Sequence, residues 1–168
     1  YAAVPSGKTV SFDPGTRVHF HADSGLILAS NASLNVNGTK SITDKFENEV
    51  IFEGDRLEPD FSDVPGQWGA IWLTDGSTNH KISNLTIKNA TIGLLIQNNN
   101  GTTVQIKNTQ IYNSSYYGIL AQTAKINGEN LVINSAGLAS LACTYGGDYK
   151  FTHSTINNNW PSSSQVAL

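Results

Sequence analysis

The chain has 168 residues, with 13 acidic and 10 basic side chains and a formal net charge of -3 at pH 7. This balance excludes the basic field that holds nucleic acid, and no apolar run approaches the roughly 18 residues that a membrane-spanning helix needs. Charged residues make up only 14% of the sequence, against about 25% in ordinary globular domains. The length fits one domain.

Residues 1–39 are predicted to form the N-terminal coils of a stacked β structure. They contain short β-prone runs, at 9–12, 17–21, 25–28 and 33–36, with turn residues such as Asp13-Pro-Gly15 and Asn37-Gly38 between them. The chain begins at Tyr1 without an initiator Met and contains no Met at all, which we interpret as a processed piece of a secreted protein.

Four histidines are weighed as possible ligands. His19 and His21 alternate with Val18 and should point out of one face, where two imidazoles can bind a transition metal. No Cys or third His lies nearby in the sequence, so no metal site is expected. His80 and His153 are isolated, and a surface or ladder role suffices for each.

Residues 40–66 are predicted to be a loop excursion that interrupts the coils, because two prolines and four acids follow the strand-like residues 49–53. Long loops on rigid scaffolds often carry function. The candidate binding residues here are Asp55, Glu58, Asp60 and Asp63. Their oxygens suit calcium, but their spacing matches neither an EF-hand nor a calcium-binding β-roll. We therefore expect a solvated loop, with Arg56 as counter-ion, that does not bind calcium strongly.

Residues 67–159 repeat with a period of about two dozen residues. Isoleucines recur at 87, 111, 133 and 156, in steps of 24, 22 and 23, and a glycine-led apolar run precedes each of them. Such a period indicates stacked supersecondary units. The β-branched runs exclude helical repeats, and propeller blades need about twice this period. We predict an all-β fold, a right-handed parallel β-helix in which Ile87, Ile111, Ile133 and Ile156 form one interior column.

Asparagines recur on both sides of these isoleucines. Stacked amides can hydrogen-bond from coil to coil, and Asn tolerates the left-handed backbone that a corner requires. Two structural ladders are predicted: Asn84, Asn108 and Asn130 in one, and Asn89, Asn113 and Asn158, with Ser135 among them, in the other.

Aromatic side chains near the turns provide a second candidate surface. Tyr112, Tyr116 and Tyr117 fall in neighbouring coils, where planar rings can stack on sugars or on one another. We expect Trp68 and Trp72 to seal the junction with the acidic loop. We also expect the single thiol, Cys143, to be buried in an apolar run.

Residues 160–168 resemble the start of a further coil or a tail. Pro161 suits a turn and residues 166–168 suit a strand, while no capping helix is encoded. We expect neighbouring coils of a longer chain beyond this point.

Four segments together resemble the opening of bacterial β-helix proteins of the pectin-lyase-like superfamily, in particular surface and secreted members, often lipoproteins, of Bacteroidetes. They are residues 5–20, 25–28, 34–39 and 66–73, and the resemblance extends to about residue 159. It implies a secreted or bacterial cell-surface location. Both adhesin-like proteins and carbohydrate-active enzymes share this opening.

The catalytic signatures of such enzymes are mostly missing. Residues 68–159 contain only three acids, Asp75, Glu129 and Asp148, which are far apart in sequence, whereas glycosidases need carboxylates that converge. No phosphate loop or zinc motif is present, so no catalytic residue, cofactor or metal is predicted. We expect a non-catalytic scaffold or adhesin-like module that contacts polysaccharide or a surface protein complex. The alternative is the N-terminal part of a polysaccharide lyase or glycoside hydrolase.

Overall fold

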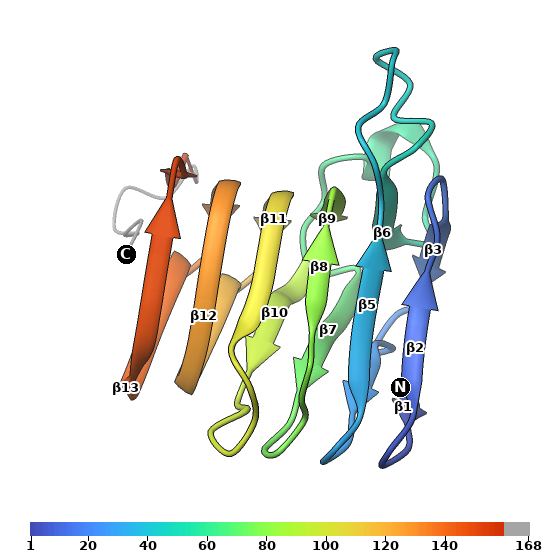
Figure 1. The fold of residues 1–168 in the computed structure, drawn as a ribbon. Coiled ribbons are helices and arrows are strands. Elements are labelled where there is room, and N and C mark those ends of the chain that lie inside the picture. The colour runs from blue at the N-terminus through green and yellow to red at the C-terminus, as the bar shows by residue number, and fades with distance from the viewer. Residues whose placement is uncertain (160–168) are drawn as a thin grey trace.

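The computed structural model describes residues 1–159 and shows a parallel β-solenoid of about six turns (Figure 1). All strand pairs are parallel, and each strand pairs with its counterparts in the preceding and following turns. No α-helix occurs among these residues. The predicted fold class is therefore confirmed, while the predicted further coil at 160–168 lies outside the described residues.

Each turn contributes to three faces. Face 1 comprises β1 (Ala2–Val4), β4 (Leu26–Leu28), β7 (Trp68–Leu73), β10 (Ala90–Ile96) and the first parts of β12 (Tyr117–Ala136) and β13 (Ala139–Thr152). Face 2 comprises β2 (Thr9–Phe12), β5 (Ser33–Asn37), β8 (Lys81–Ser83), the first half of β11 (Val104–Ser114), the middle of β12 and the later part of β13. Face 3 comprises β3 (Arg17–Phe20), β6 (Val50–Gly54), β9 (Leu85–Lys88), the ends of β11 and β12, and β14 (Thr155–Ile156).

The predicted interior column of isoleucines is confirmed. Ile111 pairs in register with Ile87 on one side and Ile133 on the other, and Ile133 pairs with Ile156. Ile87, Ile111 and Ile133 are each at most 1% exposed. Phe52 of β6 continues the column toward the N-terminus by pairing with Ile87. Equivalent positions of successive turns therefore supply one continuous core.

The corners between faces use left-handed backbone, as predicted for the asparagines. Between faces 2 and 3, Asn84, Asn108 and Asn130 have φ values of 50°, 48° and 55°. We call these three the first asparagine row. Between faces 3 and 1, Asn89 and Asn113 have φ values of 63° and 56°. A short polar side chain makes this region accessible to an L-residue, so each row marks the place where a strand bends.

Amide stacking within the first asparagine row is partial. Asn130 Nδ2 donates to Asn108 Oδ1 at 2.9 Å, which is the expected coil-to-coil bond. Asn84 Nδ2 instead donates to the Gly38 carbonyl at 3.0 Å and to Ser83 Oγ. Gly38 occupies the corresponding corner of the second turn, where a carbonyl replaces the amide.

Residues 40–66 do not form one excursion, because β6 is a regular strand of the solenoid in their middle. Val50 and Phe52 are fully buried, and β6 pairs with both β3 and β9. Two loops flank it, at residues 38–49 and 55–67. Figure 1 shows that both project from the same end of the faces, and the second contains the short 3-10 helix η1 (Pro59–Phe61). β6 is therefore a strand of the second turn, and its alternate side chains point into the core.

An aromatic cluster fills the N-terminal end of the interior. Phe20 stacks on Trp68 with ring centroids 4.3 Å apart, and both Phe12 and Phe20 meet the Phe52 ring edge to face. Trp68 is buried where the 55–67 loop rejoins the coil, as expected. Trp72 does not share this role, since it lies on the outer side of face 1.

Cys143 is exposed, contrary to the expectation of a buried thiol. It pairs with the fully buried Ala121, so it continues an interior column into the last turn that the structure describes. Residues 1–159 place no further turn over this position. Its partial burial still raises the pKa of the thiol.

His80 is also buried rather than at the surface, and it accepts and donates specific hydrogen bonds. The Leu34 backbone N–H donates to His80 Nδ1 at 3.1 Å, while Nε2 lies 3.0 Å from Ser77 Oγ. Because Nδ1 must accept, the ring is neutral with its proton on Nε2. Burial lowers the pKa of His80 from 6.5 to about 4, against a smaller opposing effect of Ser77.

Replacing Ile111 with Ala should lower the free energy of unfolding by roughly 2 to 4 kcal/mol, because the cavity would lie between two neighbouring isoleucines of the column. Val132→Ala, one residue from Ile133 but 44% exposed, is the matched control and should cost about 0.5 kcal/mol or less. Urea denaturation of the two variants measures the difference. Equal losses would contradict the assigned core.

Acidification should destabilise the protein through His80. The folded-state pKa is the lower one, so the unfolded chain binds more protons between pH 6.5 and about 4. The contribution is complete above pH 6.5, and roughly 3 kcal/mol is lost as the pH falls to about 4. Chemical denaturation at several pH values should therefore show a steeper acid loss for the native chain than for His80→Gln. Parallel profiles would contradict this assignment.

Candidate functional site

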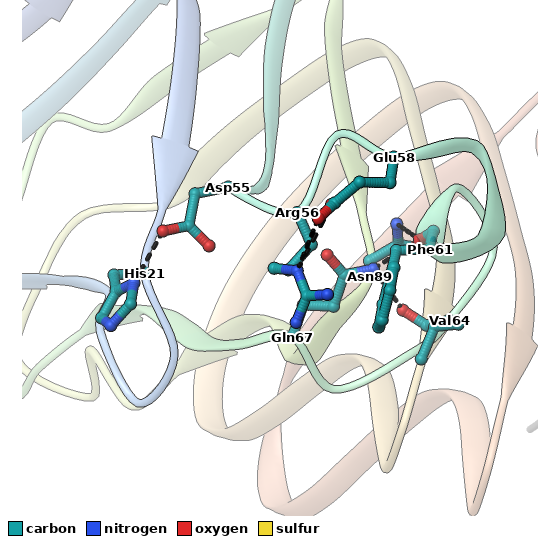
Figure 2. A network of polar contacts seen from close by, with 8 residues as sticks. All are labelled: His21, Asp55, Arg56, Glu58, Phe61, Val64, Gln67 and Asn89. Carbon is teal, nitrogen blue, oxygen red and sulfur yellow. Dashed lines mark hydrogen bonds and ion pairs between the residues drawn. The ribbon is translucent and has the colours of Figure 1, made fainter.

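The 55–67 loop is anchored to the solenoid by two side-chain amides, of the half-buried Gln67 and the buried Asn89 (Figure 2). Gln67 Nε2 donates to the carbonyls of Phe61 and Val64 at 2.6 and 2.8 Å. Asn89 Nδ2, from the corner between faces 3 and 1, donates to the Ser62 carbonyl at 2.9 Å. Asn89, predicted to be part of an amide ladder, therefore holds this loop.

Two of the predicted acidic binding residues are engaged at the start of this loop. Asp55 Oδ2 lies 2.6 Å from His21 Nδ1, and Glu58 lies 3.3 Å from Arg56 Nε (Figure 2). A hydrogen bond from its own backbone N–H, followed by Arg56, lowers the pKa of Glu58. The Arg56 guanidinium also lies 3.7 Å from the centre of the Phe61 ring. These acids therefore stabilise the loop locally.

The other two acids lie elsewhere on the loop. Asp63 accepts a hydrogen bond from Asn113 Nδ2 at 3.1 Å, and Asp60 is exposed on η1. Asn158, the last member of the second predicted ladder, donates to the Ala136 carbonyl. Within residues 1–159, no group of three or more His, Cys, Asp or Glu side chains is arranged to hold a metal ion.

His19 and His21 point outward, as predicted, and each meets an acid of the next turn. His19 Nδ1 lies 3.5 Å from Glu53 Oε1, in addition to the contact between His21 and Asp55. Lys88 Nζ approaches the other oxygen of Glu53 at 2.5 Å. Face 3 therefore carries a charged row that crosses three successive turns.

The three candidate tyrosines do not form one platform. Tyr112 follows Lys88 in the charged row of face 3, and burial raises the pKa of its hydroxyl. Tyr116 is exposed at the corner, while Tyr117 begins face 1 and pairs with Ile92. Their rings therefore belong to different faces, which a single stacked sugar would not contact together.

A polar groove runs beside the first asparagine row, under the 38–49 loop. We call it the amide groove. Its volume is about 490 Å³, and it is lined by Lys40, Glu49, Asn84, Asn108, Gln110, Asn130 and Val132. The asparagines come from three consecutive turns, so the groove follows the solenoid axis. Val132 forms an exposed apolar patch on its floor.

The wall of the amide groove is held in place by charged side chains. Arg17 donates from Nη1 to the Glu49 carbonyl at 2.9 Å and from Nη2 to the Phe46 carbonyl at 2.7 Å. Glu47 accepts from the Ile42 backbone N–H at 2.9 Å. Hydrogen bonds from the Glu47 backbone N–H and the Thr43 hydroxyl lower the pKa of Glu47 to about 2. The loop therefore forms an ordered wall despite its length.

Several hydrogen-bonding groups in the amide groove have no partner within the described part of the chain. They include the Gln110 amide and the Lys40 ammonium group, and one Glu49 oxygen is buried without a partner. Asn108 uses its carbonyl oxygen for Asn130. The groove thus offers donors and acceptors to a ligand that carries both, such as a polyol.

The acids of the regular coils do not converge. Glu129 Oε2 lies 2.8 Å from Lys107 Nζ, and Asp148 pairs in register with Lys125 on face 2. Asp75 accepts hydrogen bonds from Asn100 at the corner between faces 1 and 2. Each acid has its own partner or neighbour, which is not the arrangement of two carboxylates flanking a glycosidic bond.

Comparison with known proteins adds no relative. No protein-family model, curated protein or solved structure matches the chain. No helix in residues 1–159 is long and apolar enough to span a membrane.

Calcium at about 1 mM should raise the melting temperature by no more than about 2 °C, because the four loop acids are dispersed among separate contacts. Differential scanning fluorimetry with and without EDTA measures the shift. A larger increase that disappears in Asp60→Asn would show that the loop is a calcium site.

Proposed function

We propose that this chain is a non-catalytic β-helix scaffold of a secreted or bacterial cell-surface protein, and that its amide groove binds a neutral polysaccharide. The observation that carries the proposal is the groove itself. It combines a row of amides from successive turns with free donors and acceptors on a rigid base.

Amides suit hydroxyl-rich ligands because each can donate and accept a hydrogen bond. Lys40 and Glu49 carry opposite charges, so the groove has no net charge that would favour an acidic polymer. Successive turns of a parallel sheet lie about 4.8 Å apart, so an extended chain along the axis meets similar groups repeatedly. A polymer is therefore favoured over a single sugar.

The resemblance to the pectin-lyase-like superfamily belongs to this proposal. The parallel β-solenoid with projecting loops supports the resemblance. The proposed cell-surface location rests on the resemblance. A lyase or hydrolase is the less favoured alternative. Among residues 1–159, Glu49 is the single acid that lines the amide groove, and a hydrolase would need a second carboxylate across the ligand.

Affinity electrophoresis against neutral and acidic polysaccharides tests this proposal. Val132→Trp should change the affinity strongly without disturbing the core, because an indole on the groove floor either fills the space of the ligand or stacks on its sugar rings. Gln110→Ala should weaken binding about fivefold through the loss of one or two hydrogen bonds. Lys125→Ala, on the exposed side of face 2, is the matched control and should bind like the native chain.

Unchanged binding by a folded Val132→Trp variant, verified by circular dichroism, would exclude the amide groove. A preference for acidic polymers would contradict the inferred ligand class. Release of new reducing ends or of unsaturated sugars during incubation would support the enzyme alternative.

A further inference from the structure

Face 1 differs from the other faces in its outward row of side chains. Strand pairing places one row across six turns, and every member is apolar: Ala3, Ile27, Trp72, Leu95, Leu120 and Ala142. The equivalent row of face 2 is polar throughout, for example Asn35, Lys81 and Gln105. An apolar row on the outer side of a sheet is unusual for a surface that contacts only water.

A groove of about 530 Å³ lies along this row near the N-terminal turns, and we call it the tryptophan groove. Ile27, Trp72 and Leu95 form its floor. Tyr1 forms one wall, and its ring lies so close to Gly25 and Gly69 that neither position has room for a Cβ atom. The two glycines therefore create the space in which an aromatic wall stands beside the indole. This volume is typical of sites for small ligands.

The indole of Trp72 is fixed from one side. Its Nε1 donates to Gln97 Oε1 at 2.7 Å, and the Gln97 amide donates in turn to Gln122 Oε1. The one hydrogen-bond donor of the ring is therefore occupied. What remains for a ligand is the π surface, which attracts apolar groups and cations but forms no conventional hydrogen bond with hydroxyls.

Of the described residues that line the groove, Asp23 has the single charged side chain. It occupies a tight turn with φ of 59° and forms no ion pair within residues 1–159. An unpaired carboxylate at the edge of an aromatic groove complements a ligand that combines an apolar body with a positive charge.

We propose that the tryptophan groove binds a small organic cation, an aryl or alkyl ammonium compound. Its apolar part lies between Tyr1 and the floor of Ile27 and Leu95, and its ammonium group lies between Asp23 and the face of Trp72. This site is separate from the amide groove in both position and chemistry.

Titration calorimetry with phenethylammonium and its neutral analogue 2-phenylethanol tests the site. The native chain should bind the ammonium compound about fivefold more tightly, and added salt should reduce this preference. Asp23→Asn should remove the preference while the chain stays folded, because Asn tolerates the left-handed turn at least as well as Asp. Trp72→Ala should weaken the binding of both compounds.

Asp148→Asn is the matched control, since it removes one exposed carboxylate from face 2 and should leave the preference intact. Equal binding of the two compounds by the native chain, or an unchanged preference in Asp23→Asn, would overturn the proposal. Absence of binding by either compound would also overturn it, as would binding of a basic hydrophobic peptide without the small amine. Polysaccharide binding by Asp23→Asn should be unaffected. The proposals for the two grooves can therefore be tested independently.

Discussion

Hydrogen bonding between equivalent residues of successive turns is the constraint on which the rest of the molecule depends. Once Ile111 pairs with Ile87 and Ile133, every other residue of the turn is placed one strand spacing from its counterpart. Side chains then stand in columns, inside and outside alike. A column of one chemical kind becomes a core, a charged row or a groove, and the surface of the protein is a direct result of backbone register.

The columns of the later turns were predictable because their spacing is nearly constant, with steps of 22 to 24 residues. The asparagine corners were predictable for the same reason. The strands of residues 1–39 were also predicted. Their partners beyond the loops were not, because the loops lengthen the second turn and separate partners such as His21 and Asp55 by 34 residues. The glycine-led runs of face 1 are apolar on both sides, so periodicity could not show that Trp72 faces outward. A register shift between Ile92 and Leu94 further obscures the alternation there.

Both insertions leave the solenoid in its second turn, at the two ends of β6, where the strand pairing has already stopped. This position lets β6 keep its partners on both sides while the loops vary. Each loop then meets a different asparagine row. At the corner between faces 3 and 1, the amide nitrogens of Asn89 and Asn113 both donate hydrogen bonds to the 55–67 loop. In the first asparagine row, Asn130 donates to Asn108, and Asn84 donates to Gly38 at the start of the 38–49 loop. A groove with unused amide groups therefore remains beside that loop. The same residue type therefore fixes one loop and lines a surface under the other.

The difference between the two grooves follows from how a solenoid separates its faces. The tryptophan groove presents apolar side chains and the carboxylate of Asp23, whereas the amide groove presents amides and balanced charges. The buried column through Ile87 and Ile111 lies between them and forms part of the close-packed core. Because a close-packed core resists deformation, we expect a ligand on one groove to leave the affinity of the other unchanged. Rigid walls also reduce the conformational entropy lost on binding, so modest contacts on such a frame yield useful affinity.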